Sequence, residues 1–115
     1  MPTSITELAY RTSLDRQVLD TARGVVEGSV GIVEAARTLT GISVALGTEN
    51  EEPFISFQGI DSETDDFPLG DVRAHWNPDA LAREDAKRER YEAAVRERVI
   101  EYCQMLIARY ERLPV

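Results

Sequence analysis

The sequence is poor in cysteine, the residue that stabilises many small proteins through disulfide bonds or zinc sites. Its only cysteine, Cys103, excludes a disulfide bond within the chain and a zinc site built from cysteines. Because Cys103 falls in an apolar stripe, we expect a small buried side chain and not a reactive thiol. No apolar run approaches the roughly 20 residues of a membrane-spanning helix, and the N-terminus lacks the basic and apolar regions of a secretory signal. We therefore expect a cytoplasmic location and no membrane partner.

Common enzyme motifs are also absent. The sequence contains no G-x-S-x-G nucleophile elbow, P-loop, dinucleotide-binding G-x-G-x-x-G or H-E-x-x-H. Its only histidine, His75, has no nucleophile nearby in the sequence, so we interpret it as structural. Trp76 is expected to pack against the C-terminal helix, or to anchor a partner if it is partly exposed. We expect no catalytic residue and no cofactor, and the sequence favours a protein that is not an enzyme.

Basic residues are missing from one stretch of the chain. Residues 49–72, which we call the acidic segment, contain eight aspartates and glutamates but no lysine or arginine. The whole sequence has 21 acidic and 13 basic residues, so the charges outside the segment balance, and the net charge of −8 belongs to the segment. The negative electrostatic potential of such a segment repels nucleic acid and attracts basic proteins or cations. We expect a basic protein partner and no nucleic acid.

The N-terminal part of the chain, residues 4–46, is typical of helix. Apolar and small residues recur there at steps of three and four, which places them on one helix face; they are Leu14, Val18, Ala22, Val25, Ser29, Ile32, Ala36 and Leu39. Ser4 with Glu7, and Thr12 with Asp15, both resemble capping boxes.

Three glycines, Gly24, Gly28 and Gly31, interrupt this pattern. Each costs about 1 kcal/mol in a helix interior relative to alanine. The segment is therefore either two helices that break near Gly28, or one helix whose glycines let another helix approach closely. We favour two helices, of which the second ends at Gly47.

The C-terminal part of the chain predicts one long helix over residues 77–112. Asn77 is a good N-cap, and Pro78 suits the first helical position. An apolar stripe follows at helical spacing: Tyr91, Val95, Val99, Tyr102, Leu106, Tyr110 and Leu113. Residues 83–90 are almost wholly charged, so we expect this half of the helix to project into solvent or to meet a partner.

Residues 47–77 carry no clear periodicity and are punctuated by proline and glycine. Only Phe54–Gln58 could form a strand, and a single strand cannot satisfy its own hydrogen bonds. We predict instead a long ordered loop whose acids point outward and whose apolar residues pin it to the helices: Phe54, Ile55, Phe57, Ile60, Phe67, Leu69, Val72 and Trp76.

The predicted fold is all-α. Residues 1–115 are expected to form a single helical domain, a small bundle of about three helices with two N-terminal helices, one long C-terminal helix and a long ordered acidic loop. The apolar faces of so few helices also make a homodimer a possible partner arrangement.

The alternating acids of Asp61–Asp66 resemble the start of a calcium loop. The pattern then departs, because Asp66 stands where glycine is required and Val72 where glutamate is required. We therefore predict no metal site. Two other interpretations stay open and are compatible: a tight turn over Gly59–Thr64 that is held by side-chain capping and buries Ile60, and a recognition surface for a basic partner. The candidate binding residues are Asp61, Glu63, Asp65, Asp66, His75 and Trp76.

The run Gly59–Asp65, followed by Pro68–Gly70 and Trp76–Pro78, resembles a pattern in small uncharacterised bacterial proteins. The resemblance covers about twenty residues. It implies that the loop is a recurring feature, and it transfers no activity and no catalytic residue.

The leading functional hypothesis is a small acidic protein-binding module that presents residues 49–72 to a basic partner. An immunity protein that neutralises a basic toxin is its concrete version. The alternatives are a cation-dependent or small-molecule enzyme with its site at Asp61–Asp66, and a structural homodimer without a site.

Overall fold

The computed structural model describes residues 4–112, and within them the chain is helical without any strand. The elements are α1 (Ile5–Glu27), α2 (Ile32–Leu46), α3 (Phe54–Glu63), the short 3₁₀ helix η1 (Gly70–His75) and α4 (Pro78–Glu111). Residues 1–3 and Leu113, the last member of the predicted stripe, lie outside the described part. The all-α prediction is confirmed, but the prediction of about three helices is wrong because the middle of the chain adds α3 and η1.

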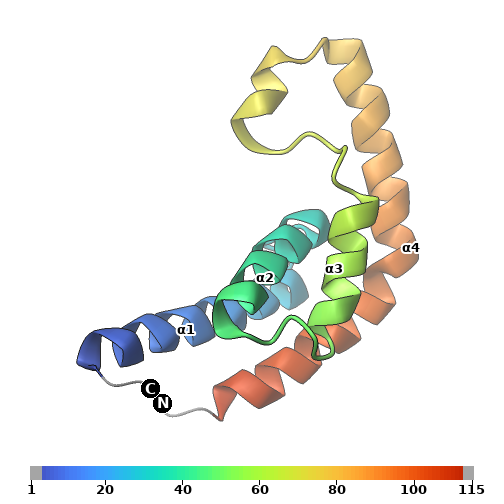
Figure 1. Cartoon of the computed structure of the whole chain (residues 1–115). Helices are drawn as coiled ribbons and strands as arrows, with labels where there is room; N and C mark the ends of the chain where they lie inside the picture. The colour runs from blue at the N-terminus through green and yellow to red at the C-terminus, as the bar shows by residue number, and fades with distance from the viewer. Residues whose placement is uncertain (1–3, 113–115) are drawn as a thin grey trace.

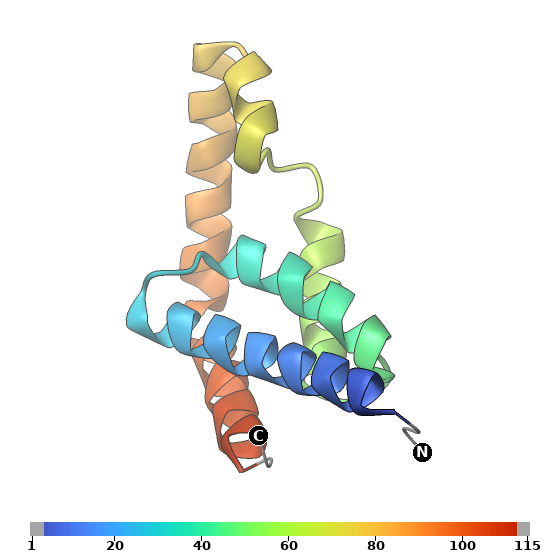
Figure 2. The ribbon, with the colours of Figure 1, turned by 90° about the vertical axis from the view of Figure 1, so that its left-hand side faces the viewer.

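The N-terminal segment forms a pair of antiparallel helices, α1 and α2 (Figure 2). The favoured break is confirmed: Gly28 ends α1 with a φ of 88°, a left-handed conformation that favours glycine. Ser4 caps α1 as expected, accepting a hydrogen bond of 3.0 Å from the Glu7 amide. The second proposed capping box is wrong, because Thr12 lies inside α1.

The core forms where the C-terminal half of α4 crosses α1, with α2 and α3 packed against them (Figure 2). The predicted stripe of α4 supplies Val95, Val99, Leu106 and Tyr110 as buried residues. Cys103 is fully buried beside them, as expected, and its burial raises the pKa of the thiol to about 11. The thiol therefore stays protonated at neutral pH and serves as packing.

The predicted long loop is wrong over Phe54–Glu63, where the chain forms α3. Phe54, Phe57 and Ile60 follow one another at steps of three, so they share one helix face, and all three are buried. Ring pairs tie this face to α4: Phe54 meets Tyr110 edge-on at 6.3 Å, and Phe57 meets Tyr102 at 5.9 Å. A strand at Phe54–Gln58 is thereby excluded.

The prediction that apolar residues pin the middle of the chain holds only in part. Phe54, Phe57 and Ile60 are buried, and Phe67, Leu69 and Trp76 are half-buried. Ile55 and Val72 instead expose 45% and 49% of their surface. Burial fails at these two because Ile55 lies on the face of α3 away from Phe54 and Phe57, and Val72 lies in η1, which has no buried residue.

The charged N-terminal half of α4 stands clear of the other α-helices and is accompanied by η1 (Figures 1 and 2). We call residues 70–90 the spur. Arg73 of η1 donates two hydrogen bonds of 2.8 Å to the carboxylate of Asp85, and a third of 3.2 Å to the carbonyl of Pro68. A bidentate pair of this kind fixes orientation as well as distance. The charged half-helix thus holds a segment of its own chain.

The ion pair in the spur predicts a local response to acid. The hydrogen bonds from Arg73 lower the pKa of Asp85 below its ordinary value of 3.8, with the charges of Arg73 and Arg88 acting in the same direction. A carboxyl group whose pKa is lower in the folded state than in the unfolded state stabilises the fold at pH values above the unfolded-state pKa. This stabilisation is lost as the pH falls through the folded-state pKa. We expect the amide NMR signals of η1 to change in that acidic range, before the core unfolds.

The matched variants for this test are Asp85→Asn and Asp71→Asn. Asp85→Asn should reproduce the acid spectrum of η1 at neutral pH, because it removes the charge that Arg73 contacts. Asp71→Asn, an exposed acid in the same 3₁₀ helix, should shift only the amides next to it and should leave the acid response caused by Asp85 in place. An identical acid response in the wild type and in Asp85→Asn would contradict the assignment.

None of the helices in the described part of the chain combines the length and the apolar character that crossing a bilayer requires.

Candidate functional site

The structure does not bring the six predicted site residues to one place. Asp61 and Glu63 lie in the last turn of α3 but face different neighbours: Asp61 contacts Arg37 of α2, and Glu63 contacts Tyr91 of α4. The others are Asp65 and Asp66 in the turn after α3, and His75 and Trp76 at the junction of η1 and α4. His75 is exposed and Trp76 is half-buried.

The turn after α3 is held by Arg37, a residue of α2. The Nη2 atom of Arg37 donates to the carbonyl oxygens of Thr64, Asp65 and Phe67 at 2.9, 3.3 and 2.9 Å. Its Nε lies 3.7 Å from a carboxylate oxygen of Asp61. One guanidinium thus gathers the carbonyls at the C-terminal end of α3, where the helix dipole also favours a cation.

This geometry settles how the turn is built. The interpretation of a capped tight turn over Gly59–Thr64 is wrong, because the chain stays helical to Glu63. Among the described residues of the turn, only Thr64 bonds the local backbone through its side chain, donating 2.6 Å to the carbonyl of Ile60 from a buried position. Arg37 does the rest from outside the segment. The sequence offered one indication of this role: Arg37 is the only basic residue between Arg23 and Arg73.

The acidic segment presents less free charge than its composition indicates. Several of its carboxylates have partners: Glu51 pairs with Arg109 at 2.6 Å, and Glu52 accepts 2.7 Å from Ser56. By contrast Asp65, Asp66 and Asp71 are exposed and have no cationic partner among residues 4–112. We call residues 64–72, which carry these three, the acidic turn.

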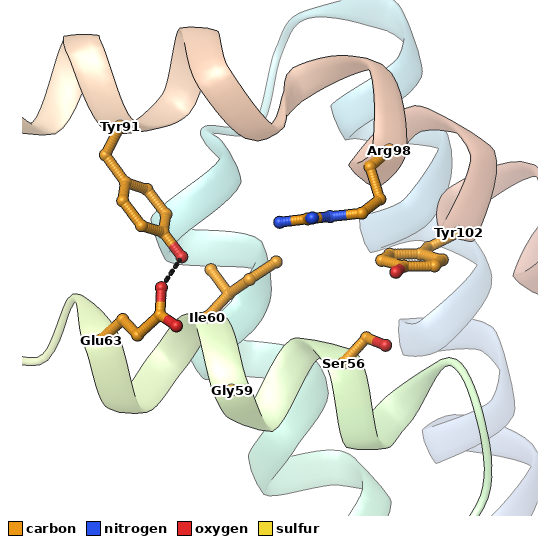
Figure 3. Close-up of a pocket in the computed structure, with 7 residues that line it drawn as sticks. All are labelled: Ser56, Gly59, Ile60, Glu63, Tyr91, Arg98 and Tyr102. Carbon is orange, nitrogen blue, oxygen red and sulfur yellow. Dashed lines mark hydrogen bonds between the residues drawn. The ribbon is translucent and has the colours of Figure 1, made fainter.

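A pocket of about 240 Å³ opens between α3 and α4 (Figure 3). The two helices meet through the ring pairs described above, and Gly59 of α3 adds no side chain to fill the space between them. The lining residues come from both helices: Ser56, Gly59, Ile60, Glu63, Tyr91, Arg98 and Tyr102. Of the six predicted site residues, only Glu63 belongs to it.

The pocket combines opposite charges with phenol groups. At one side the Tyr91 hydroxyl donates 2.7 Å to Oε2 of Glu63. Burial is the main cause that raises the pKa of Tyr91 to about 12, and the hydrogen bond to Glu63 and the charge of Glu63 add to it. This phenol therefore stays protonated and acts as a donor. Arg98, which is exposed, has no carboxylate within ion-pair distance among the described residues. In Figure 3 its guanidinium reaches over Ile60 toward Tyr91.

Sequence reasoning missed Arg98, Tyr91 and Tyr102 as site residues. Helical spacing could have found them, because Arg98 lies seven residues after Tyr91 and four before Tyr102, on the same face of α4. The sequence pattern instead assigns the two tyrosines to the apolar stripe. The opposite wall of the pocket could not be seen at all, since α3 was expected to be a loop.

No cluster of three or more histidine, cysteine or acidic residues in the described part of the chain is placed to hold a metal ion. Asp61–Asp66, the run that resembles a calcium loop, is instead divided between α3 and the acidic turn. No protein-family model, no curated protein and no solved structure matches the chain.

Proposed function

We propose that the protein is a binding module that captures a basic protein through the acidic turn. The observation that carries this proposal is the set of hydrogen bonds from Arg37 to three backbone carbonyls of the turn. They are the carbonyls of Thr64, Asp65 and Phe67. These bonds order the backbone of the turn while its carboxylates stay in solvent. An ordered surface loses less conformational entropy on binding than a flexible one does.

Charge and apolar surface lie together on this turn. Asp65, Asp66 and Asp71 carry unpaired negative charge, and Val72 exposes 49% of its surface next to Asp71. Carboxylates of one sign speed the encounter with a basic protein, and the exposed side chain offers contact area once the two have met. An immunity protein that blocks a basic toxin is the concrete form of this proposal, because both properties suit fast capture of a cationic partner.

The first test uses a triple variant, Asp65→Asn, Asp66→Asn and Asp71→Asn. Affinity capture from native lysate at low salt should yield a stoichiometric basic partner with the wild type. The triple variant should associate with that partner at least about tenfold more slowly, because steering by opposite charge raises association rates by roughly 10–1,000-fold. Biosensor kinetics at several salt concentrations would measure it, with the rate of the wild type falling as salt rises.

The matched control removes the same charge elsewhere, as Asp20→Asn, Glu97→Gln and Glu101→Gln on exposed positions of α1 and α4. This variant should bind nearly as fast as the wild type. Asp61 and Glu63 are kept intact in both variants, since Arg37 and Tyr91 contact them. Equal loss in the two triple variants, or no basic partner at any salt concentration, would refute the proposal.

A further inference from the structure

We propose that the pocket between α3 and α4 binds a small zwitterion, a molecule with one carboxylate and one ammonium group, of the size of a free amino acid. This site is separate from the proposed protein-binding surface, because none of Asp65, Asp66 and Asp71 lines the pocket. The two proposals can therefore fail independently.

The anion-binding group of the pocket is the guanidinium of Arg98, which extends over Ile60 between Tyr91 and Tyr102 (Figure 3). Within residues 4–112 no hydrogen bond or ion pair is made by the guanidinium of Arg98 or by the hydroxyl of Tyr102. A guanidinium presents five N–H donors in a planar fork that matches a carboxylate. A ligand carboxylate here would accept from donors that no described residue accepts from.

The cation-binding end consists of Glu63 and Tyr91. The Tyr91 hydroxyl occupies only Oε2 of Glu63, so Oε1 has no donor among the described residues. Because the phenol acts as the donor in this bond, it orients the carboxylate without neutralising it. This second oxygen can accept a hydrogen bond from a ligand ammonium, which carries three N–H donors.

The separation of the two ends is what selects a zwitterion. Glu63 and Arg98 line the same pocket, yet they do not come within ion-pair distance of each other. A ligand with a single charge would satisfy one end and meet the like charge at the other. A ligand with both charges satisfies both ends, with the buried side chain of Ile60 beneath it.

The size of the pocket restricts the ligand further. Its volume is about 240 Å³, below the range of about 300–1,000 Å³ that is typical of sites for drug-sized ligands. A water molecule takes about 30 Å³ of liquid, so the space corresponds to about eight waters. The ligand is therefore a molecule of few atoms, such as an amino acid, and not a nucleotide.

The experiment is an NMR titration of the whole protein with glycine, β-alanine and γ-aminobutyrate, whose charges lie progressively farther apart. We expect saturable shifts of amides in residues 56–63 and 91–102 with at least one of them, in the millimolar range of Kd that suits so small a ligand. Acetate and methylammonium, which carry one charge each, should bind about tenfold or more weakly than the best zwitterion.

Matched variants separate the pocket from general charge effects. Arg98→Gln and Glu63→Gln should each weaken the best zwitterion by about tenfold or more, whereas Arg96→Gln, an exposed arginine that does not line the pocket, should not. The same spectra report whether each variant is folded.

Three results would overturn the inference. The first is the absence of saturable shifts with all three zwitterions. The second is equal binding by Arg98→Gln and Arg96→Gln. The third is acetate binding as tightly as the best zwitterion with no effect of Glu63→Gln, which would identify a simple anion site.

Discussion

Replacing Phe57 with alanine is expected to lower the free energy of unfolding by about 3–5 kcal/mol. The side chain is fully buried, and it meets Tyr102 of α4 edge-on at 5.9 Å. Its loss removes apolar area from α3 and leaves a cavity that the surrounding helices cannot fully close. A domain of this size is stable by only about 5–15 kcal/mol, so the variant should unfold at far lower urea concentration, or fail to fold.

Urea unfolding followed by circular dichroism measures the effect, and Ile55→Ala supplies the control on the same helix. Ile55 is the residue of α3 that exposes 45% of its surface, so its truncation should cost no more than about 1 kcal/mol. Two equal costs would mean that α3 does not pack on the core as described. Thermal unfolding offers a second reading if Phe57→Ala is too unstable for a full urea curve.

Replacing Gly24 with alanine is expected to destabilise the protein by about 1–3 kcal/mol, although alanine is the better helix former. A Cβ atom at this position would lie 2.4 Å from Cγ2 of Val30 and 3.1 Å from its Cβ. Valine is stiff about χ1, so it cannot swing away cheaply. The amide of Val30 also donates 3.1 Å to the carbonyl of Gly24, which ties the turn to the end of α1.

Gly41→Ala is the matched control, and we expect it to change stability in the opposite direction. Gly41 lies inside α2, and a Cβ there would meet nothing within 4 Å. The substitution should stabilise the protein by about 0.5–1 kcal/mol, because glycine loses more backbone entropy in a helix than alanine does. Both changes can be read as midpoints of thermal or urea unfolding.

A double variant tests the cause of the Gly24 effect. Adding Val30→Ala to Gly24→Ala removes the Cγ2 atom that would clash, so the two changes together should cost less than the sum of their separate costs. Strict additivity would show that close approach of the α1–α2 turn is not the reason for glycine at position 24.

The sequence by itself determined the elements that depend on neighbouring residues. The break between α1 and α2 falls at Gly28 because a left-handed residue is needed there, and the start of α4 falls at Asn77, whose side chain accepts from the amides of Asp79 and Ala80. The apolar stripe of α4 and the burial of Cys103 follow from the period of a long helix. These are local properties, and helical spacing reveals them.

Only the tertiary structure decided α3, and with it the site. A helix of 10 residues is too short to be stable alone in water, so Phe54–Glu63 becomes helical only by packing on α2 and α4. The same packing assigns partners from far along the chain: Arg37 to the acidic turn, and Tyr91 to Glu63. Those distant contacts decide which carboxylates stay free and which line a pocket. The composition gives the number of charged residues, but it does not show which of them form pairs.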